Sequence, residues 1–268
     1  YNSGQPEKPG AARFVDFVRW QQTQDHDAAL AYWREQLGDF SEPTRVQQQV
    51  ARSVHDPTSG DIHHKASFDI SEADTLALQS LARDCRLTIN TVIEGIWGIL
   101  LAQWSGQSDI VFGAVVPCRP AAVDCIEQIV GLTMNTLPVR LQLASEQSLT
   151  DMLQRHQMMQ VERRQYEYSA LAAIKPLSGL PVGAPLFDTV ISVQGYLRKH
   201  ASLQDWARHL GADSFHLIDW NDLALSVAID VGPQIGVLLK FDGRQFQRSA
   251  IEDMLRDFEA CFQGLLAN

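Results

Sequence analysis

The sequence predicts an α/β fold in which helices flank a mixed sheet. Segments with the period of an amphipathic helix interleave with short apolar segments that have the composition of strands. The chain has 268 residues, of which 45% are hydrophobic, so a sizeable core can form. No internal Pro-, Gly- or Ser-rich linker divides it. We therefore expect a flexible lead-in over residues 1–10 and one domain over residues 11–268.

Two amphipathic helices are predicted near the start of the chain. Phe14 and Phe17 lie on one face of the segment 12–22, and the segment 27–40 repeats apolar residues, among them Trp33, at the same spacing. Residues 41–60 are polar and irregular, which indicates a loop.

The segment 61–70, DIHHKASFDI, alternates between apolar and polar residues, which predicts a half-buried strand. Its adjacent histidines invite an active-site interpretation, since histidine moves protons near neutral pH. Neighbours on a strand point to opposite faces, however, so His64 would face the core with Phe68 while His63 would face solvent with Asp69. We therefore expect no catalytic pair here.

Capping patterns and periodicity predict four further helices. Ser71 with Asp74 and Ser249 with Glu252 have capping-box spacing at the starts of two of them. The segment 89–104 carries an apolar stripe wide enough for a core helix. The fourth helix runs from Ser148 to about Tyr166. Strands are predicted over 109–116, 135–143, 187–194, 222–231 and 235–243, the last two as a hairpin.

Composition excludes several classes of function. The formal net charge is -10 and no basic cluster stands out, which argues against a broad nucleic-acid surface. The longest apolar run, 92–101, is too short to span a bilayer. The four cysteines show neither CxxC spacing nor a disulfide framework, so we expect no metal site and reduced thiols in a cytoplasmic protein.

Common catalytic motifs do not occur in the sequence. It contains no GxSxG, P-loop or GxGxxG pattern. The cluster DSFH, 213–216, is more typical of a surface turn than of a triad. His156 falls on the apolar side of its helix, which is typical of a core histidine whose hydrogen bonds are satisfied.

Five stretches, in order along the chain, resemble the condensation domains of nonribosomal peptide synthetases. They are similar to the family patterns YxDFAxWQ…YW, SGQxDxxxGxxxxGRP, VGxFxNTLPxR, YEHTPL…LFDS and RxDLxL. The matching segments are FVDFVRW with YWREQL (14–20 and 32–37), GQSDIVFGAVVPCRP (106–120), VGLTMNTLPVR (130–140), YEYSAL with LFDTVISVQ (166–171 and 186–194), and WNDLALSV (220–227).

The resemblance implies a fold and a reaction. Condensation domains are V-shaped pairs of chloramphenicol-acetyltransferase-like halves, and their catalytic HHxxxDG motif lies in the N-terminal half, upstream of the first matching stretch. This chain therefore resembles the C-terminal half, residues 11–268, with no catalytic residue of its own. The family joins an acyl or peptidyl thioester to an amine, both carried on phosphopantetheine arms of carrier proteins. These arms are substrates, and the chain is expected to bind no cofactor.

The matched residues are candidates for the substrate tunnel or for the contact between the halves. The Asn135 amide could hold an amide-like substrate or a loop, or it could cap the strand entry. Arg140 and Arg119 could pair across the halves or meet a pantetheine phosphate, and for Arg140 a structural salt bridge is favoured. Trp20 is expected to pack the helix between the halves.

The sequence also departs from the family patterns. Pro117-Cys118 precedes Arg119, Thr133 replaces Phe, and Tyr168 and Ala170 replace His and Pro. Trp220 stands where the late motif has Arg, while Asp222 is kept. Acidic carrier proteins could dock on exposed basic side chains, of which the candidates are Arg155, Arg163, Arg164, Arg198 and Lys199.

Two alternatives remain at this stage. A degenerate half could act as a non-catalytic module that binds carrier or partner proteins. The chain could also belong to an epimerisation, cyclisation or ester-forming relative, since these share the C-terminal half in outline.

Overall fold

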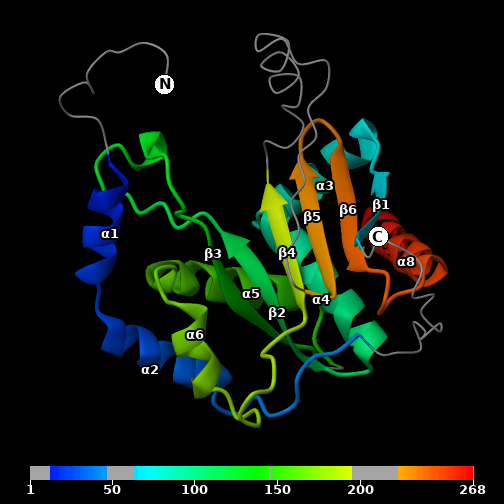
Figure 1. Ribbon diagram of the computed structural model, residues 1–268. Coiled ribbons are helices and arrows are strands. Elements are labelled where there is room, and N and C mark those ends of the chain that lie inside the picture. The colour runs from blue at the N-terminus through cyan, green and yellow to red at the C-terminus, as the bar shows by residue number, and fades with distance from the viewer. Residues whose placement is uncertain (1–12, 47–62, 145, 195–222, 268) are drawn as a thin grey trace.

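The computed structural model describes residues 13–46, 63–144, 146–194 and 223–267 (Figure 1). Its centre is a six-stranded sheet with the order β1-β6-β5-β4-β2-β3. The β2–β4 and β4–β5 pairs are parallel and the others are antiparallel, so the predicted mixed sheet is confirmed. The strands are β1 (His63–Asp69), β2 (Asp109–Val116), β3 (Asn135–Gln142), β4 (Thr189–Gln194), β5 (Leu225–Val231) and β6 (Ile235–Asp242).

Helices cover both faces of this sheet (Figure 1). One face packs on α4, α5 and α8 through the largest apolar cluster, and the other packs on α2 and α6 at the β2–β3 end. The helices are α1 (Phe14–Gln22), α2 (His26–Leu37), α3 (Glu72–Asp84), α4 (Ile89–Ser105), α5 (Leu149–Arg163), α6 (Leu171–Ile174) and α8 (Arg248–Leu266).

The predicted core helix is confirmed as α4. Thr88 caps its start by accepting a hydrogen bond from the Thr91 N–H at 3.1 Å, and Gly106 ends it at a φ of 71°, which favours glycine. Within its apolar stripe Trp97 and Leu100 are completely buried. The helix spans the sheet and so forms the floor on which α5 and α8 pack.

The edge strand β3 tolerates a proline in its middle. Pro138 lies opposite Gly113 of β2, and no strand of the described residues pairs with the other edge of β3. Because proline lacks an N–H group, it suits an edge strand, where one side of the ladder needs no donor.

The histidines of the segment 61–70 point apart, as predicted for a strand. His64 faces inward and stacks on Phe241 with ring centroids 5.5 Å apart, while His63 lies on the opposite side of β1. The capping box of α3 is also confirmed, because Ser71 Oγ accepts from the Asp74 N–H at 3.1 Å.

Two sequence predictions need correction. The last helix begins at Arg248 with Gln247 as its N-cap and has no side-chain cap bond, so Ser249 is not the cap. In α1 only Phe17 is buried, whereas Phe14 is 37% exposed. Several sequence predictions lie outside the described residues: the lead-in 1–10, the cluster 213–216, Trp220, Asp222, Arg198 and Lys199.

In the described part of the chain the four cysteines are unpaired and do not form disulfides. No single described helix is long and apolar enough to cross a membrane; α3 and α4 pass that test only as a pair bent by 100°.

Candidate functional site

Asn135, at the first position of β3, holds a neighbouring segment in place. Its Nδ2 donates to the carbonyl oxygens of Glu167 at 2.8 Å and Ser169 at 2.7 Å. Its Oδ1 accepts from the backbone N–H of Thr136 at 2.9 Å. Of the roles open to Asn135 in the sequence, the structure selects those of loop holder and backbone cap, because both amide hydrogens are already used.

Tyr168 connects this segment to α1 and α2. Its hydroxyl donates to the Asp25 carbonyl oxygen at 2.8 Å, and its ring meets Trp20 edge-on with centroids 6.0 Å apart. Trp20 in turn stacks on Phe17 at 5.8 Å. The tyrosine that replaces the family's histidine therefore has a structural partner. Trp20 packs α1 against this segment, and its predicted place between the halves stays a prediction.

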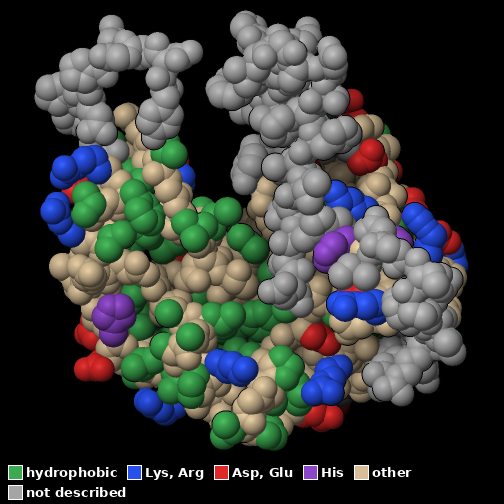
Figure 2. Space-filling model, in the orientation of Figure 1, with side chains coloured by type: hydrophobic (Ala, Val, Ile, Leu, Met, Phe, Trp, Pro, Cys, Tyr) green, Lys and Arg blue, Asp and Glu red, His purple; other side chains and the backbone are tan. Residues whose placement is uncertain are grey.

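An exposed apolar surface lies beside this contact. Its members, which we call the 130–134 patch, are Phe14 (37% exposed), Val15 (42%), Val130 (94%), Leu132 (75%) and Met134 (52%). A Cβ placed on Gly131 would lie 2.2 Å from the Phe14 ring, so α1 and this loop are in direct contact. Figure 2 shows hydrophobic side chains gathered over α1 and the loop beside it. Contiguous apolar surface of this kind marks an interaction site.

Arg119 acts within the loop that leads to the patch. Its guanidinium donates to the carbonyl oxygen of Ile126, seven residues further on. Cys118 and Cys125 in the same loop both have positive φ angles, 43° and 52°. Burial raises the pKa of the Cys118 thiol to about 12, which keeps it protonated and unreactive. The loop therefore has a fixed backbone path.

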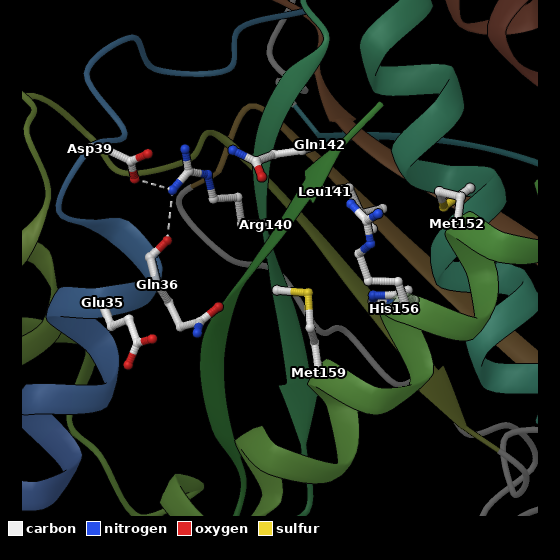
Figure 3. A pocket seen from close by; sticks show the side chains of 10 residues that line it. Glu35, Gln36, Asp39, Arg140, Leu141, Gln142, Met152, His156 and Met159 are labelled. Atoms are coloured by element: carbon white, nitrogen blue, oxygen red, sulfur yellow. Dashed lines mark hydrogen bonds and ion pairs between the residues drawn. The ribbon is translucent and has the colours of Figure 1, made fainter. Parts of the chain in front are cut away.

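Arg140 forms the structural salt bridge that the sequence favours. Its guanidinium donates in bidentate fashion to Asp109 of β2, from Nε at 2.8 Å and from Nη2 at 2.6 Å. Nη1 donates to the Gln36 carbonyl oxygen at 2.8 Å and to the Asp39 carboxylate, as Figure 3 shows. Arg140 hydrogen bonds hold the pKa of Asp39 below its usual range. This arginine therefore ties the end of α2 to the sheet.

A buried polar network joins α4 to α5, and sequence reasoning missed it. Glu94 Oε2 lies 3.0 Å from His156 Nε2, 2.8 Å from Gln160 Nε2 and 3.5 Å from Arg163 Nη2. Burial opposes ionisation of Glu94, but the Arg163 charge and the hydrogen bonds from His156 and Gln160 lower its pKa to about 2. Arg163 is thus buried and paired, which corrects its assignment as a docking charge.

A signal for this network was present in the sequence. Residues 156, 160 and 163 share one face of α5, and Glu94 is the one acidic residue inside the apolar stripe of α4. The satisfied core histidine predicted at position 156 is confirmed, with its partner now identified.

A cavity of about 190 Å³ opens between α2, β3 and α5 (Figure 3). Arg140 and Met159 line it, together with the backs of the two helices. Its complete lining is Glu35, Gln36, Asp39, Arg140, Leu141, Gln142, Met152, Arg155, His156 and Met159.

Comparison with known proteins identifies the family. The family model named condensation domain matches residues 1–268, so the chain belongs to the condensation domain family. Among curated relatives, a linear gramicidin synthase protein of Brevibacillus parabrevis is 32% identical across 100% of the chain, which covers 5% of that protein. Surfactin synthase subunit 3 of Bacillus subtilis (strain 168) is 26% identical across 100% of the chain and 21% of its own length.

Solved structures share the fold. The condensation domain from the monacolin K polyketide synthase MokA superposes with a TM-score of 0.76 at 16% identity, over 99% of this chain and 63% of its own. The X-domain from teicoplanin biosynthesis gives 0.74 at 16% identity, over 98% of this chain and 62% of its own, and that domain has also been solved in a complex with OxyB. The chain thus spans less than two thirds of these structures.

Proposed function

We propose that this chain is the C-terminal subdomain of a condensation domain that joins a carrier-bound acyl or peptidyl thioester to a carrier-bound amine. The observation that carries the proposal is the paired coverage: solved condensation domains match nearly the whole chain, while the chain accounts for about three fifths of them. The absence of HHxxxDG from the sequence agrees with this. Residues 11–268 would supply one wall of the tunnel and a docking surface, with the phosphopantetheine arms as substrates.

The 130–134 patch is the surface that we assign to the N-terminal subdomain. Val130 is almost fully exposed, and burying apolar area of this size on a partner is favourable at about 25 cal/mol per Å². Asn135 and Tyr168 hold the backbone around the patch, so its shape is set before a partner arrives. Within this assignment, Arg119 and Arg140 support the surface and do not touch the substrate.

Complementation of the two halves tests this function. The chain and its natural N-terminal half are produced separately, mixed, and given two loaded carrier proteins, and amide product is measured by mass spectrometry. We expect product only when both halves are present, because the catalytic histidine would come from the other half. Amide formation by this chain alone, or an unchanged rate after substitution of the upstream histidine, would overturn the proposal.

A matched pair of valines tests the patch. Val130→Asp should weaken association of the two halves at least about tenfold, since a carboxylate would be desolvated in the interface. Val182→Asp is the control, because Val182 is also fully exposed and lies outside the patch. Association is measured by titration calorimetry. Equal affinity of both variants would remove the patch from the interface.

A non-catalytic binding module is the second candidate. Thr133, Tyr168 and Ala170 depart from the family patterns, and the polar atoms of Asn135 are spent on protein partners. This candidate predicts carrier binding without any amide product in the reassembled domain. Product analysis in the same assay also separates the epimerising, cyclising and ester-forming relatives, because each leaves a different covalent product.

A further inference from the structure

The cavity between α2, β3 and α5 is independent of the 130–134 patch, since the two share no residue. Its volume of about 190 Å³ is smaller than the several hundred Å³ typical of drug-sized ligands, which suits a small metabolite. Met152, Met159 and Leu141 supply apolar lining, and polar side chains supply the rest. In Figure 3 the Met159 side chain projects from α5 into the space between the elements.

The charges on the lining are divided between two sides. Glu35 and Asp39 come from α2 and the turn that follows it, whereas Arg155 and His156 come from α5. Arg140 lies between them, but its charge is matched by Asp109 and Asp39. Within the described ranges Arg155 has no ion-pair partner. The cavity therefore presents carboxylates on one side and an uncommitted cation on the other.

His156 is oriented toward a ligand role by the network behind it. Because Glu94 is ionised, His156 Nε2 at 3.0 Å must carry the hydrogen and donate it to Glu94. The Gln160 amide nitrogen, 2.8 Å from Glu94, is also a donor, so it cannot use His156 Nε2 as its acceptor while that nitrogen is protonated. Among the described residues Nδ1 has no hydrogen-bond partner, so this nitrogen is left for a ligand.

A second polar group nearby also lacks a partner. A smaller cavity of about 20 Å³ shares Gln36, Arg140, His156 and Met159 with the larger one, and Trp33 lines it. Trp33 is 2% exposed, and its indole N–H has no acceptor in the described part of the structure. Leaving a buried donor unpaired costs about 1–3 kcal/mol, so an acceptor oxygen here would be stabilising.

We propose that this cavity binds a small zwitterion, with free α-amino acids as the chemical class. The ammonium group would lie toward Glu35 and Asp39, and the carboxylate toward Arg155 and His156. A short side chain would contact the methionines. Recognition by two opposite charges at once explains why neither side of the lining is neutralised by the other.

Methyl NMR of the full chain tests this proposal. The methionine methyl groups are ¹³C-labelled, those of Met152 and Met159 are assigned, and the protein is titrated with L-alanine. Propionate and ethylammonium serve as matched probes, because each is alanine without one of its two charged groups. We expect saturable shifts of both methyls with alanine and at least about tenfold weaker binding of each single-charge probe. Non-saturating shifts, or equal affinity for all three compounds, would overturn the proposal.

Variants locate the binding site. Arg155→Gln and Glu35→Gln should each weaken alanine binding about tenfold, and both residues are exposed enough for the fold to survive their change. Arg34→Gln is the control, because Arg34 is an exposed arginine of α2 that does not line the cavity. Binding that falls equally in the Arg34 and Arg155 variants would show that only net charge matters and would refute the site. These measurements need no carrier protein, so their outcome is separate from that of the condensation assay.

Discussion

The α4–α5 interface and the 130–134 patch invert the usual distribution of polar and apolar groups. Between the helices, Glu94 and Arg163 are charged and buried, and each meets partners within the protein. In the patch, Val130 and Leu132 are apolar and exposed, and their nearest contacts leave most of their surface open. The buried charges are already compensated, whereas the exposed apolar surface requires a partner that this chain does not supply.

Removing Glu94 should break the first region most severely. Glu94→Ala would leave the Arg163 charge buried and unpaired, which we expect to cost about 3–5 kcal/mol of unfolding free energy. Urea denaturation measures this cost. Glu35→Ala on the exposed face of α2 is the control and should change stability by less than about 0.5 kcal/mol. A small loss for Glu94→Ala would mean that the network contributes little.

Removing the Asn135 amide should loosen the second region. Asn135→Ala deletes the two hydrogen bonds to the carbonyls of Glu167 and Ser169, at an expected cost of about 2 kcal/mol. Hydrogen exchange should show faster exchange in residues 166–171, while protection of α4 stays unchanged. Asn135→Asp is a useful second variant, since its carboxylate keeps the shape but cannot donate to those carbonyls. Unchanged exchange in both variants would contradict the holding role.

A comparison of two buried carboxyls sharpens the lesson about compensation. Asp188 has an enclosed carboxyl oxygen without a partner among the described residues, and burial raises its pKa to about 6. Its folded form therefore favours protonation, and stability is lost as pH rises from the unfolded value of 3.8 through about 6. Asp188→Asn should stabilise the protein by about 1–2 kcal/mol at pH 7 and have no such effect below pH 3.8.

Glu94 should show the opposite dependence on pH. Its pKa is lowered from 4.5 to about 2, so the stability that it contributes is present above pH 4.5 and is lost as pH falls toward 2. Thermal melts of the wild type and of Asp188→Asn across this range measure both effects. If the difference between the two proteins did not change with pH, the assignment to Asp188 would be wrong.

Local patterns predicted most of the fold. The alternation in the segment 61–70 separated His63 from His64, because side chains on any strand point alternately to its two faces. The stripe of α4 and the cap at Ser71 were equally visible. The start of the last helix was misplaced because Ser249 lies just inside a helix that begins at Arg248 without a side-chain cap.

The candidate site was less predictable. Arg163 looked like a docking charge because nothing near it in the sequence identifies Glu94 as its partner. Arg140 could be assigned a salt bridge, but its partners Asp109 and Asp39 come from separate segments. The exposure of Val130 was equally hidden, since an apolar residue in a loop can be buried or open.

By itself, the sequence determined the type and order of the elements, the resemblance to condensation domains and the separation of the two histidines. These follow from backbone geometry, which gives helices and strands fixed periods that a few consecutive residues display. Only the tertiary structure decided which side chains compensate Glu94, what Asn135 holds, and where a cavity and an apolar surface stay open. Those outcomes depend on contacts between residues far apart in the chain, and no local period encodes them.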